Sequence, residues 1–146
     1  GGARGYEIFE KVRLKAEKLI ESGDVIVLLG AGDVVINALQ RVSSVVLQKS
    51  LREGFGLTVA EASWKGVPVV AGAVGGIPLQ IIDGETGYLV DSRDLRGCAE
   101  RIVTLLENPE LARSMGAAGR EYVRQNFLVT RLLGHELEIF AEILGG

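Results

Sequence analysis

The sequence has neither the several cysteines that stabilise small secreted proteins nor the basic surplus that is typical of nucleic-acid binders. Cys98 is its one cysteine, so no internal disulfide can form and a reducing, cytoplasmic setting is expected. The net charge is -3, from 16 Lys and Arg against 19 Asp and Glu. Nucleic-acid binders usually carry a basic surplus that neutralises phosphates, so no nucleic-acid partner is expected.

Long apolar runs are also missing. The run at residues 25–29 is far shorter than the roughly 20 residues that cross a bilayer, so no membrane span is expected. The N-terminus lacks a basic stretch followed by an apolar one, which argues against a signal peptide. Met115 is the single methionine, so we expect the chain to be part of a longer protein.

What the sequence does contain is typical of one folded domain. Of its 146 residues, 47% are hydrophobic and 24% charged, enough for a single buried core. Its 20 glycines cluster where strands are expected to end. Glycine at such places permits tight turns and close approach of the backbone to a ligand.

Apolar spacing predicts helices that alternate with strands. Each predicted strand is a short, uninterrupted apolar run, which is typical of a parallel sheet covered on both faces. The predicted elements are helix 1–22, strand 25–29, helix 34–41, strand 44–48, helix 57–66, strand 68–71, a short helix 78–82, strand 88–90, helices on either side of Asn108 and Pro109, and a last apolar stripe over 132–144.

Three glycine-bearing loops follow predicted strands, at residues 30–32, 53–58 and 75–76. Right-handed crossovers place all strand-to-helix loops at one edge of a parallel sheet. Ligands of such sheets bind beyond the carboxyl ends of the strands. We therefore expect the three loops to converge on a ligand.

The segment from Glu53 to Glu61 carries the chemistry. Gly54, Phe55 and Gly56 precede a helix, whose first amides lack partners and carry a partial positive charge, so they suit a diphosphate. Glu53 would be repelled by that anion and is expected to accept hydrogen bonds from hydroxyls. Glu61 has two oxygens for a vicinal diol such as a ribose. A phosphate between two polyols describes a nucleotide sugar.

Simpler interpretations exist for each part of this segment. A glycine-rich loop before a helix is often only a turn. Glu61 alone also fits a solvated helix residue, or the partner of Thr58 in a Thr-x-x-Glu capping box. Lys49 and Arg52 are the nearest cations and fit either a ligand contact or a structural charge. The pair of glutamates around the glycines favours the ligand.

Residues 53–61 resemble the E-x7-E motif of the retaining glycosyltransferases of family 4. The similarity continues in order through residues 66–70, 74–76 and 83–90. It implies an α/β fold with a Rossmann-like parallel sheet and helices on both faces. It also implies that the chain is the incomplete C-terminal half of a GT-B glycosyltransferase. Residues 1–146 are then the nucleotide-sugar-binding domain without the N-terminal acceptor domain. The segments 37–41, 46–50 and 73–81 are similar to the trehalose synthases, which join glucose from a nucleoside-diphosphate glucose to free glucose.

The resemblance implies a role for each motif residue. Glu61 would hold the ribose hydroxyls, and Glu53, the candidate catalytic residue, would hold hydroxyls of the donor sugar. The distal phosphate would lie on the backbone amides of Leu57 and Thr58. The amides expected to assist Glu53 are those of Gly54, Phe55 and Gly56.

The resemblance also implies the reaction and its partners. Hexosyl transfer proceeds with retention, and the leaving phosphate helps to deprotonate an acceptor sugar, without protein nucleophile, metal or cofactor. The sequence has no Asp-x-Asp metal motif, and assembly into a homo-oligomer is left open. Relatives place an Arg and a Lys on the diphosphate from a segment that precedes this chain's first helix. Many carry Glu where Leu79 stands, whereas Gln80 follows the trehalose synthases.

Two other functions fit the same residues. A binding or assembly module that kept the fold and lost catalysis would explain the missing cation pair. A sugar-nucleotide epimerase of similar architecture would need no acceptor sugar.

Overall fold

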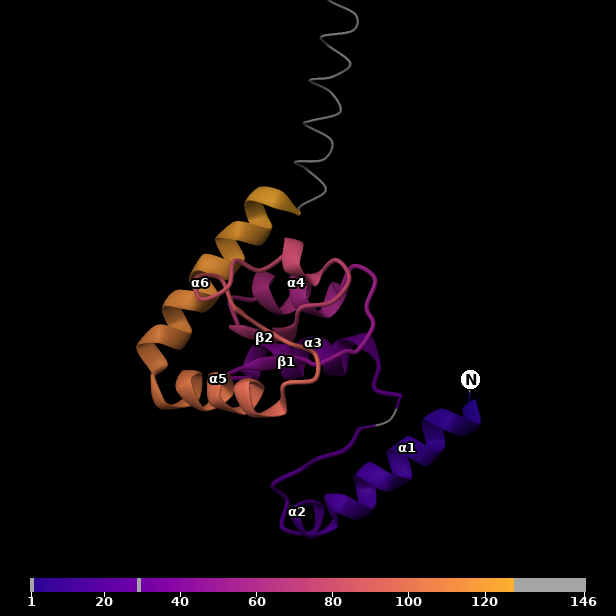
Figure 1. Ribbon diagram of the computed structural model, residues 1–146. Coiled ribbons are helices and arrows are strands. Elements are labelled where there is room, and N and C mark those ends of the chain that lie inside the picture. The colour runs from indigo at the N-terminus through magenta and orange to yellow at the C-terminus, as the bar shows by residue number, and fades with distance from the viewer. Residues whose placement is uncertain (1, 29, 128–146) are drawn as a thin grey trace, which may run out of the picture. The chain divides into compact units, whose positions relative to one another are not determined.

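The computed structural model describes residues 2–28 and 30–127. The chain forms two units, residues 1–35 and 36–146, which are coloured along the chain in Figure 1. The predicted apolar stripe over residues 132–144 lies outside the described residues.

The N-terminal unit begins with helices α1 (Gly2–Lys15) and α2 (Glu17–Glu21), where the sequence predicted one helix over residues 1–22. Ala16 separates them, with φ of -94° and ψ of 2° in place of helical angles. The Ala16 amide still donates to the Val12 carbonyl, and the Ile20 amide to the Ala16 carbonyl, each at 2.9 Å. The predicted helix is therefore present with a break at one residue.

The strand predicted over residues 25–29 is wrong for its described part. Residues 25–28 have no regular secondary structure, and Ile26 is 79% exposed. The Val25 amide donates to the Leu19 carbonyl at 3.0 Å, which closes the turn after α2. A strand exists only through bonds to a neighbouring strand, and an apolar run does not specify that neighbour.

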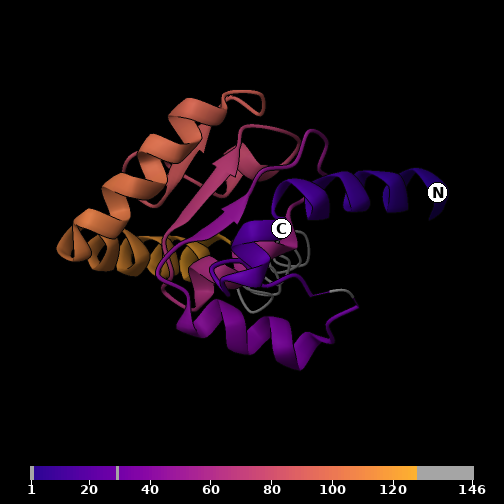
Figure 2. The ribbon, with the colours of Figure 1, turned by 90° about the horizontal axis from the view of Figure 1, so that it is seen from below.

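The C-terminal unit contains a parallel sheet in the order β1-β2-β3, as Figure 2 shows by arrows that point the same way. Val46 pairs with Val69, and Val70 pairs with Tyr88. These strands confirm three of the predicted ones, and the helices between them confirm the predicted alternation. The elements are α3 (Asp33–Val42), which begins in the N-terminal unit, β1 (Val46–Gln48), α4 (Leu57–Trp64), β2 (Val69–Gly72), the 3-10 helix η1 (Ile77–Leu79), β3 (Tyr88–Val90), α5 (Leu95–Glu107) and α6 (Pro109–Asn126).

Successive residues of β2 enter two different hydrophobic clusters, because side chains alternate between the faces of a sheet. Val69 and Ala71 pack with side chains of α4 and η1, whereas Val70 packs with side chains of α5 and α6. Cys98 is buried in the second cluster. The buried members are Val59, Ala62, Val69, Ala71, Ile77 and Ile81 in the first cluster, and Val70, Tyr88, Val90, Cys98, Leu105 and Met115 in the second.

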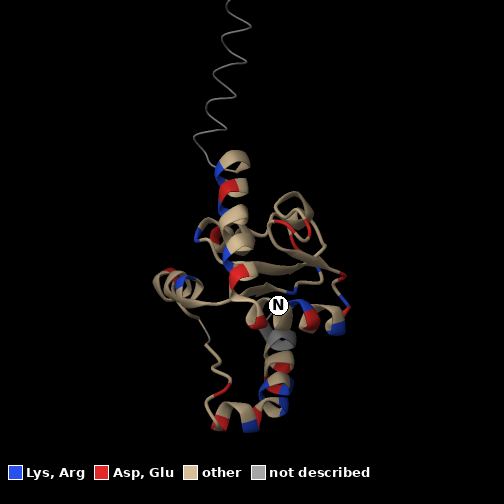
Figure 3. Cartoon of the chain, turned by 90° about the vertical axis from the view of Figure 1, so that its left-hand side faces the viewer, with Lys and Arg blue, Asp and Glu red and all other residues tan. Residues whose placement is uncertain are grey.

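Acidic and basic residues are interspersed along α6, the helix that ends next to the grey trace in Figure 3. Hydrogen bonds from Arg124, and then from Gln125, lower the pKa of Glu121 to about 2. These groups are exposed, and surface ion pairs contribute little to stability. No helix among the described residues combines the length and the apolar character needed to cross a membrane.

Two adjacent leucines of α5 test this packing. Leu105 is 1% exposed in the second cluster, whereas Leu106 is 55% exposed. We expect Leu105→Ala to lower the free energy of unfolding by about 2–5 kcal/mol, because it removes buried methyl groups and leaves a cavity. Leu106→Ala, the same change at the exposed neighbour, should cost less than about 1 kcal/mol. Urea denaturation of the two variants measures both values, and equal losses would contradict the packing.

Candidate functional site

Two of the three glycine loops meet beyond the carboxyl ends of β1 and β2. The Gly76 amide donates to the Gly54 carbonyl at 2.7 Å. A Cβ at Gly75 would lie 1.9 Å from the Glu53 carbonyl oxygen, so glycine alone permits this approach. These two loops therefore meet as predicted, and their convergence on a ligand stays a prediction. For the loop at residues 30–32, which belongs to the N-terminal unit, it stays a prediction.

Helix α4 begins with amides that have no hydrogen-bond partner among the described residues. Its N-cap is Gly56, in the left-handed conformation with φ of 81°, and no side chain caps the helix. The alternative of a Thr58–Glu61 capping box is therefore wrong, because Thr58 lies inside the helix. Within the described part of the chain, the amides of Phe55, Gly56, Leu57 and Thr58 donate to no carbonyl or side chain. Such amides, together with the helix dipole, favour an anion at this place.

The Glu53 carboxylate is oriented by three donors. Its Oε2 accepts from Gln48 Nε2 at 3.0 Å and from Ser50 Oγ at 3.3 Å. Its Oε1 accepts from the amide of Gly54 at 3.1 Å. No role was predicted for Gln48 or Ser50, although Gln48 is a polar residue at the end of a predicted buried strand and Ser50 follows it closely.

The Glu61 carboxylate is exposed and is held from a different element. Its Oε2 accepts from Gln40 Nε2 of α3 at 3.4 Å. Gln40 is 5% exposed, and its Oε1 accepts from Lys65 Nζ at 2.6 Å. Each predicted carboxylate thus accepts a hydrogen bond from a glutamine amide. Sequence spacing does not reveal this role of Gln40, because its side chain could have faced solvent from the same helix.

The two candidate cations differ in their surroundings. Lys49 Nζ donates to the Asp91 carbonyl at 2.8 Å and so joins the ends of β1 and β3. Arg52 is exposed, and its guanidinium pairs with no group in residues 2–28 and 30–127. An ammonium group has three N–H donors, so the bond to Asp91 leaves Lys49 two for a ligand. The contact of Lys49 or of Arg52 with the donor stays a prediction.

An aromatic residue at the end of α6 packs against Phe55 in the loop that precedes α4. The Phe55 ring packs edge-on against Phe127, with centroids 5.8 Å apart, and Phe127 packs in the same way against Tyr122 at 5.9 Å. The Tyr122 hydroxyl donates to the Leu79 carbonyl at 3.1 Å. This aromatic contact joins residues far apart in sequence, so spacing could not have revealed it.

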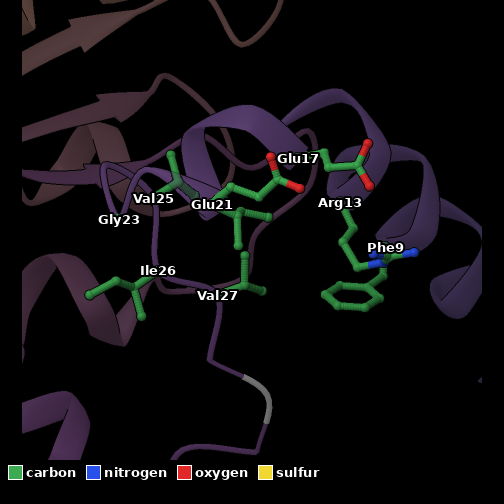
Figure 4. A pocket seen from close by; sticks show the side chains of 9 residues that line it. Phe9, Arg13, Glu17, Glu21, Gly23, Val25, Ile26 and Val27 are labelled. Atoms are coloured by element: carbon green, nitrogen blue, oxygen red, sulfur yellow. The ribbon is translucent and has the colours of Figure 1, made fainter.

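A cavity of about 620 Å³ lies elsewhere, within the N-terminal unit. Figure 4 shows its lining side chains, which come from α1, α2 and the segment after α2. Apolar side chains such as Phe9, Ile26 and Val27 lie there beside the charged Arg13 and Glu21. None of the predicted donor-binding residues lines this cavity, so we place the candidate site at the start of α4.

The described geometry belongs to a class of parallel α/β domains that bind ligands at the carboxyl edge of the sheet. Residues 5–122 match the family described as glycosyl transferases group 1. The match covers most of the chain, which therefore belongs to this family of glycosyltransferases. The resemblance found in the sequence is confirmed.

Individual relatives agree with this assignment. The chain is 48% identical over 145 residues to a trehalose synthase of Pyrococcus horikoshii, across 97% of this chain and 34% of that protein. It spans between about a fifth and a third of the length of the curated relatives it matches.

Solved structures share the fold. The C-terminal domain of a glycosyl transferase group 1 family protein, LpcC from Francisella tularensis, superposes with a TM-score of 0.78 at 24% identity, over 87% of this chain and 66% of that one. Anabaena HepE in complex with UDP-glucose superposes with a TM-score of 0.80 at 23% identity, over 97% of this chain and 38% of that one. The fold is that of the C-terminal GT-B domain, as predicted.

The loop contact can be tested with two glycines that share a positive φ. Gly75 has φ of 56° and Gly84 φ of 80°, but a Cβ at Gly84 meets nothing within 4 Å. Gly84→Ala should therefore cost only the strain of the left-handed conformation, about 1–2 kcal/mol. Gly75→Ala adds overlap with the Glu53 carbonyl, so we expect a larger loss, by about a further 1–3 kcal/mol.

Urea denaturation of both variants measures the difference. The meeting of the two loops would be contradicted by a Gly75→Ala variant as stable as Gly84→Ala.

Proposed function

We propose that this chain is the donor-binding part of a retaining hexosyltransferase. The proposed reaction transfers a glucosyl unit from a nucleoside-diphosphate glucose to an acceptor sugar, with glucose as acceptor and trehalose as product. The observation that carries the proposal is the set of amides at the start of α4 that have no partner in the described part of the chain, flanked by Glu53 and Glu61. Family membership and the 48% identity to a trehalose synthase support it.

The donor would span the start of α4. Its distal phosphate would accept hydrogen bonds from the amides of Leu57 and Thr58, where the helix dipole favours negative charge. Its ribose would lie on Glu61, whose exposed carboxylate keeps acceptor sites beyond the bond from Gln40.

Glu53 would contact the transferred sugar. A carboxylate has about four lone-pair sites, and Gln48, Ser50 and Gly54 occupy three of them. About one site remains for a sugar hydroxyl. Because three protein donors fix the carboxylate, that remaining site has a defined direction, which suits Glu53 to position the donor sugar.

The chemical step needs no group on this chain to form a covalent bond. The bond between the anomeric carbon and the phosphate oxygen breaks, and a bond from that carbon to the acceptor oxygen forms on the same face. The acceptor's proton passes to the leaving diphosphate. The amides at the start of α4 would stabilise the charge that develops on the diphosphate, which is the electrostatic form of catalysis.

The setting we propose is the cytoplasm. Cys98 is a buried free thiol, and reducing compartments keep thiols in this state.

Glu61 provides the direct test. In the full-length protein we expect Glu61→Ala to weaken binding of the nucleoside-diphosphate glucose by roughly 10- to 100-fold, because the loss of charge-assisted hydrogen bonds costs about 1.5–3 kcal/mol. Calorimetry with UDP-, ADP- and GDP-glucose measures this. Glu107→Ala, the same change at an exposed residue ending α5, is the matched control and should bind as the wild type does.

The outcomes separate the alternatives. The proposal fails if none of the three nucleotides binds and Glu61→Ala changes nothing. Binding without transfer to any sugar would indicate a module that has lost catalysis. Conversion of the donor without an acceptor would indicate an epimerase.

A further inference from the structure

We infer that Gln80 is a positioning residue for the donor site: its buried amide turns the peptide groups of the 54–56 loop so that their N–H groups face the donor. This inference rests on the proposed function. It concerns a residue that does not itself touch the donor.

The second glycine loop and Gln80 hold two successive carbonyls of the first loop. The Gly76 amide donates to the Gly54 carbonyl at 2.7 Å. Gln80 Nε2 donates to the next carbonyl, that of Phe55. Gln80 lies just after η1 and is 1% exposed. Bulk water therefore does not reach this position to donate a hydrogen bond to the Phe55 carbonyl in place of the Gln80 amide.

Holding a carbonyl also fixes the neighbouring amide. All peptide bonds of the described residues are trans, and in a planar trans peptide the C=O and N–H groups point in opposite directions. The Phe55 N–H therefore points away from Gly76, and the Gly56 N–H points away from Gln80. Gly56 is left-handed, and a left-handed residue is an ingredient of the backbone nests in which successive amides surround an anion.

The chemistry of the side chain argues against a role in packing alone. Gln80 Oε1 is buried and, among the described residues, accepts no hydrogen bond. A buried polar atom without a partner costs free energy. An apolar side chain of similar volume would avoid that cost if the position only filled space. What such a side chain could not do is donate to the Phe55 carbonyl.

Two replacements at this position separate the roles. Gln80→Met keeps the volume and removes the donor. Gln80→Glu places a second acceptor against the Phe55 carbonyl when ionised, but a donor when protonated. Burial favours the neutral form of a carboxyl group. Protonation, and with it the hydrogen bond to Phe55, is therefore gained as the pH falls.

The experiment measures calorimetric affinity in the full-length protein, with whichever of UDP-, ADP- and GDP-glucose the wild type binds. We expect Gln80→Met to weaken binding by roughly tenfold or more, the effect of a lost preorganised hydrogen bond, while its stability in urea is unchanged or higher. We expect the affinity of Gln80→Glu, relative to wild type at the same pH, to rise as the pH is lowered from about 8 to about 5.5. Gln125→Met and Gln125→Glu, on the exposed face of α6, are matched controls and should do neither.

Three results would overturn the inference: wild-type affinity in Gln80→Met, a loss of affinity that only follows a loss of stability, or an affinity of Gln80→Glu that does not change with pH relative to wild type. If Gln80→Met does not fold, the pH comparison of Gln80→Glu decides alone. Failure of the proposed function is distinguishable, because the wild type itself would then bind none of the three nucleotides.

Discussion

The site depends on a contact between two backbones, that of Gly75 and Gly76 with that of Glu53 and Gly54. A Cβ at Gly75 would lie 1.9 Å from a carbonyl oxygen, so the contact exists only because the side chain is absent. The close approach brings the Gly76 amide to the Gly54 carbonyl and the Gln80 side-chain amide to the Phe55 carbonyl. Without it, the direction of the loop amides would not be defined.

The parallel sheet is what brings these loops together. Strands β1 and β2 run in the same direction, so the segments that follow them leave from one edge. Gly72, at the end of β2, allows the segment after β1 to pass close by, because a Cβ there would lie 3.1 Å from the Ser50 carbonyl oxygen. Lys49 crosses the same edge to the Asp91 carbonyl. The candidate site thus lies beside β2, whose four residues are all buried.

The sequence predicted the features that depend on neighbours along the chain. Periodic apolar residues located α5, and Pro109 located the start of α6. It could not predict features that depend on distant partners. The apolar run at residues 25–28 does not specify a neighbouring strand, so the predicted strand could not be judged from it. The bond from Gln80 to Phe55 joins residues 25 apart, and no spacing rule gives the direction of such side chains. At the start of α4 two local signals competed, and the left-handed Gly56 took the cap in place of Thr58.

Two carboxylates beside the proposed diphosphate would present an electrostatic conflict in a chain of net charge -3. The structure reduces the conflict by surrounding each carboxylate with neutral donors: Gln48, Ser50 and a backbone amide at Glu53, and Gln40 at Glu61. The diphosphate would likewise meet amide dipoles in the first turn of α4. Fixed dipoles need no reorganisation when charge develops on the leaving group, whereas a mobile cation does. Neutral donors would therefore allow the proposed polyol-binding carboxylates and an anion to lie together at the start of α4.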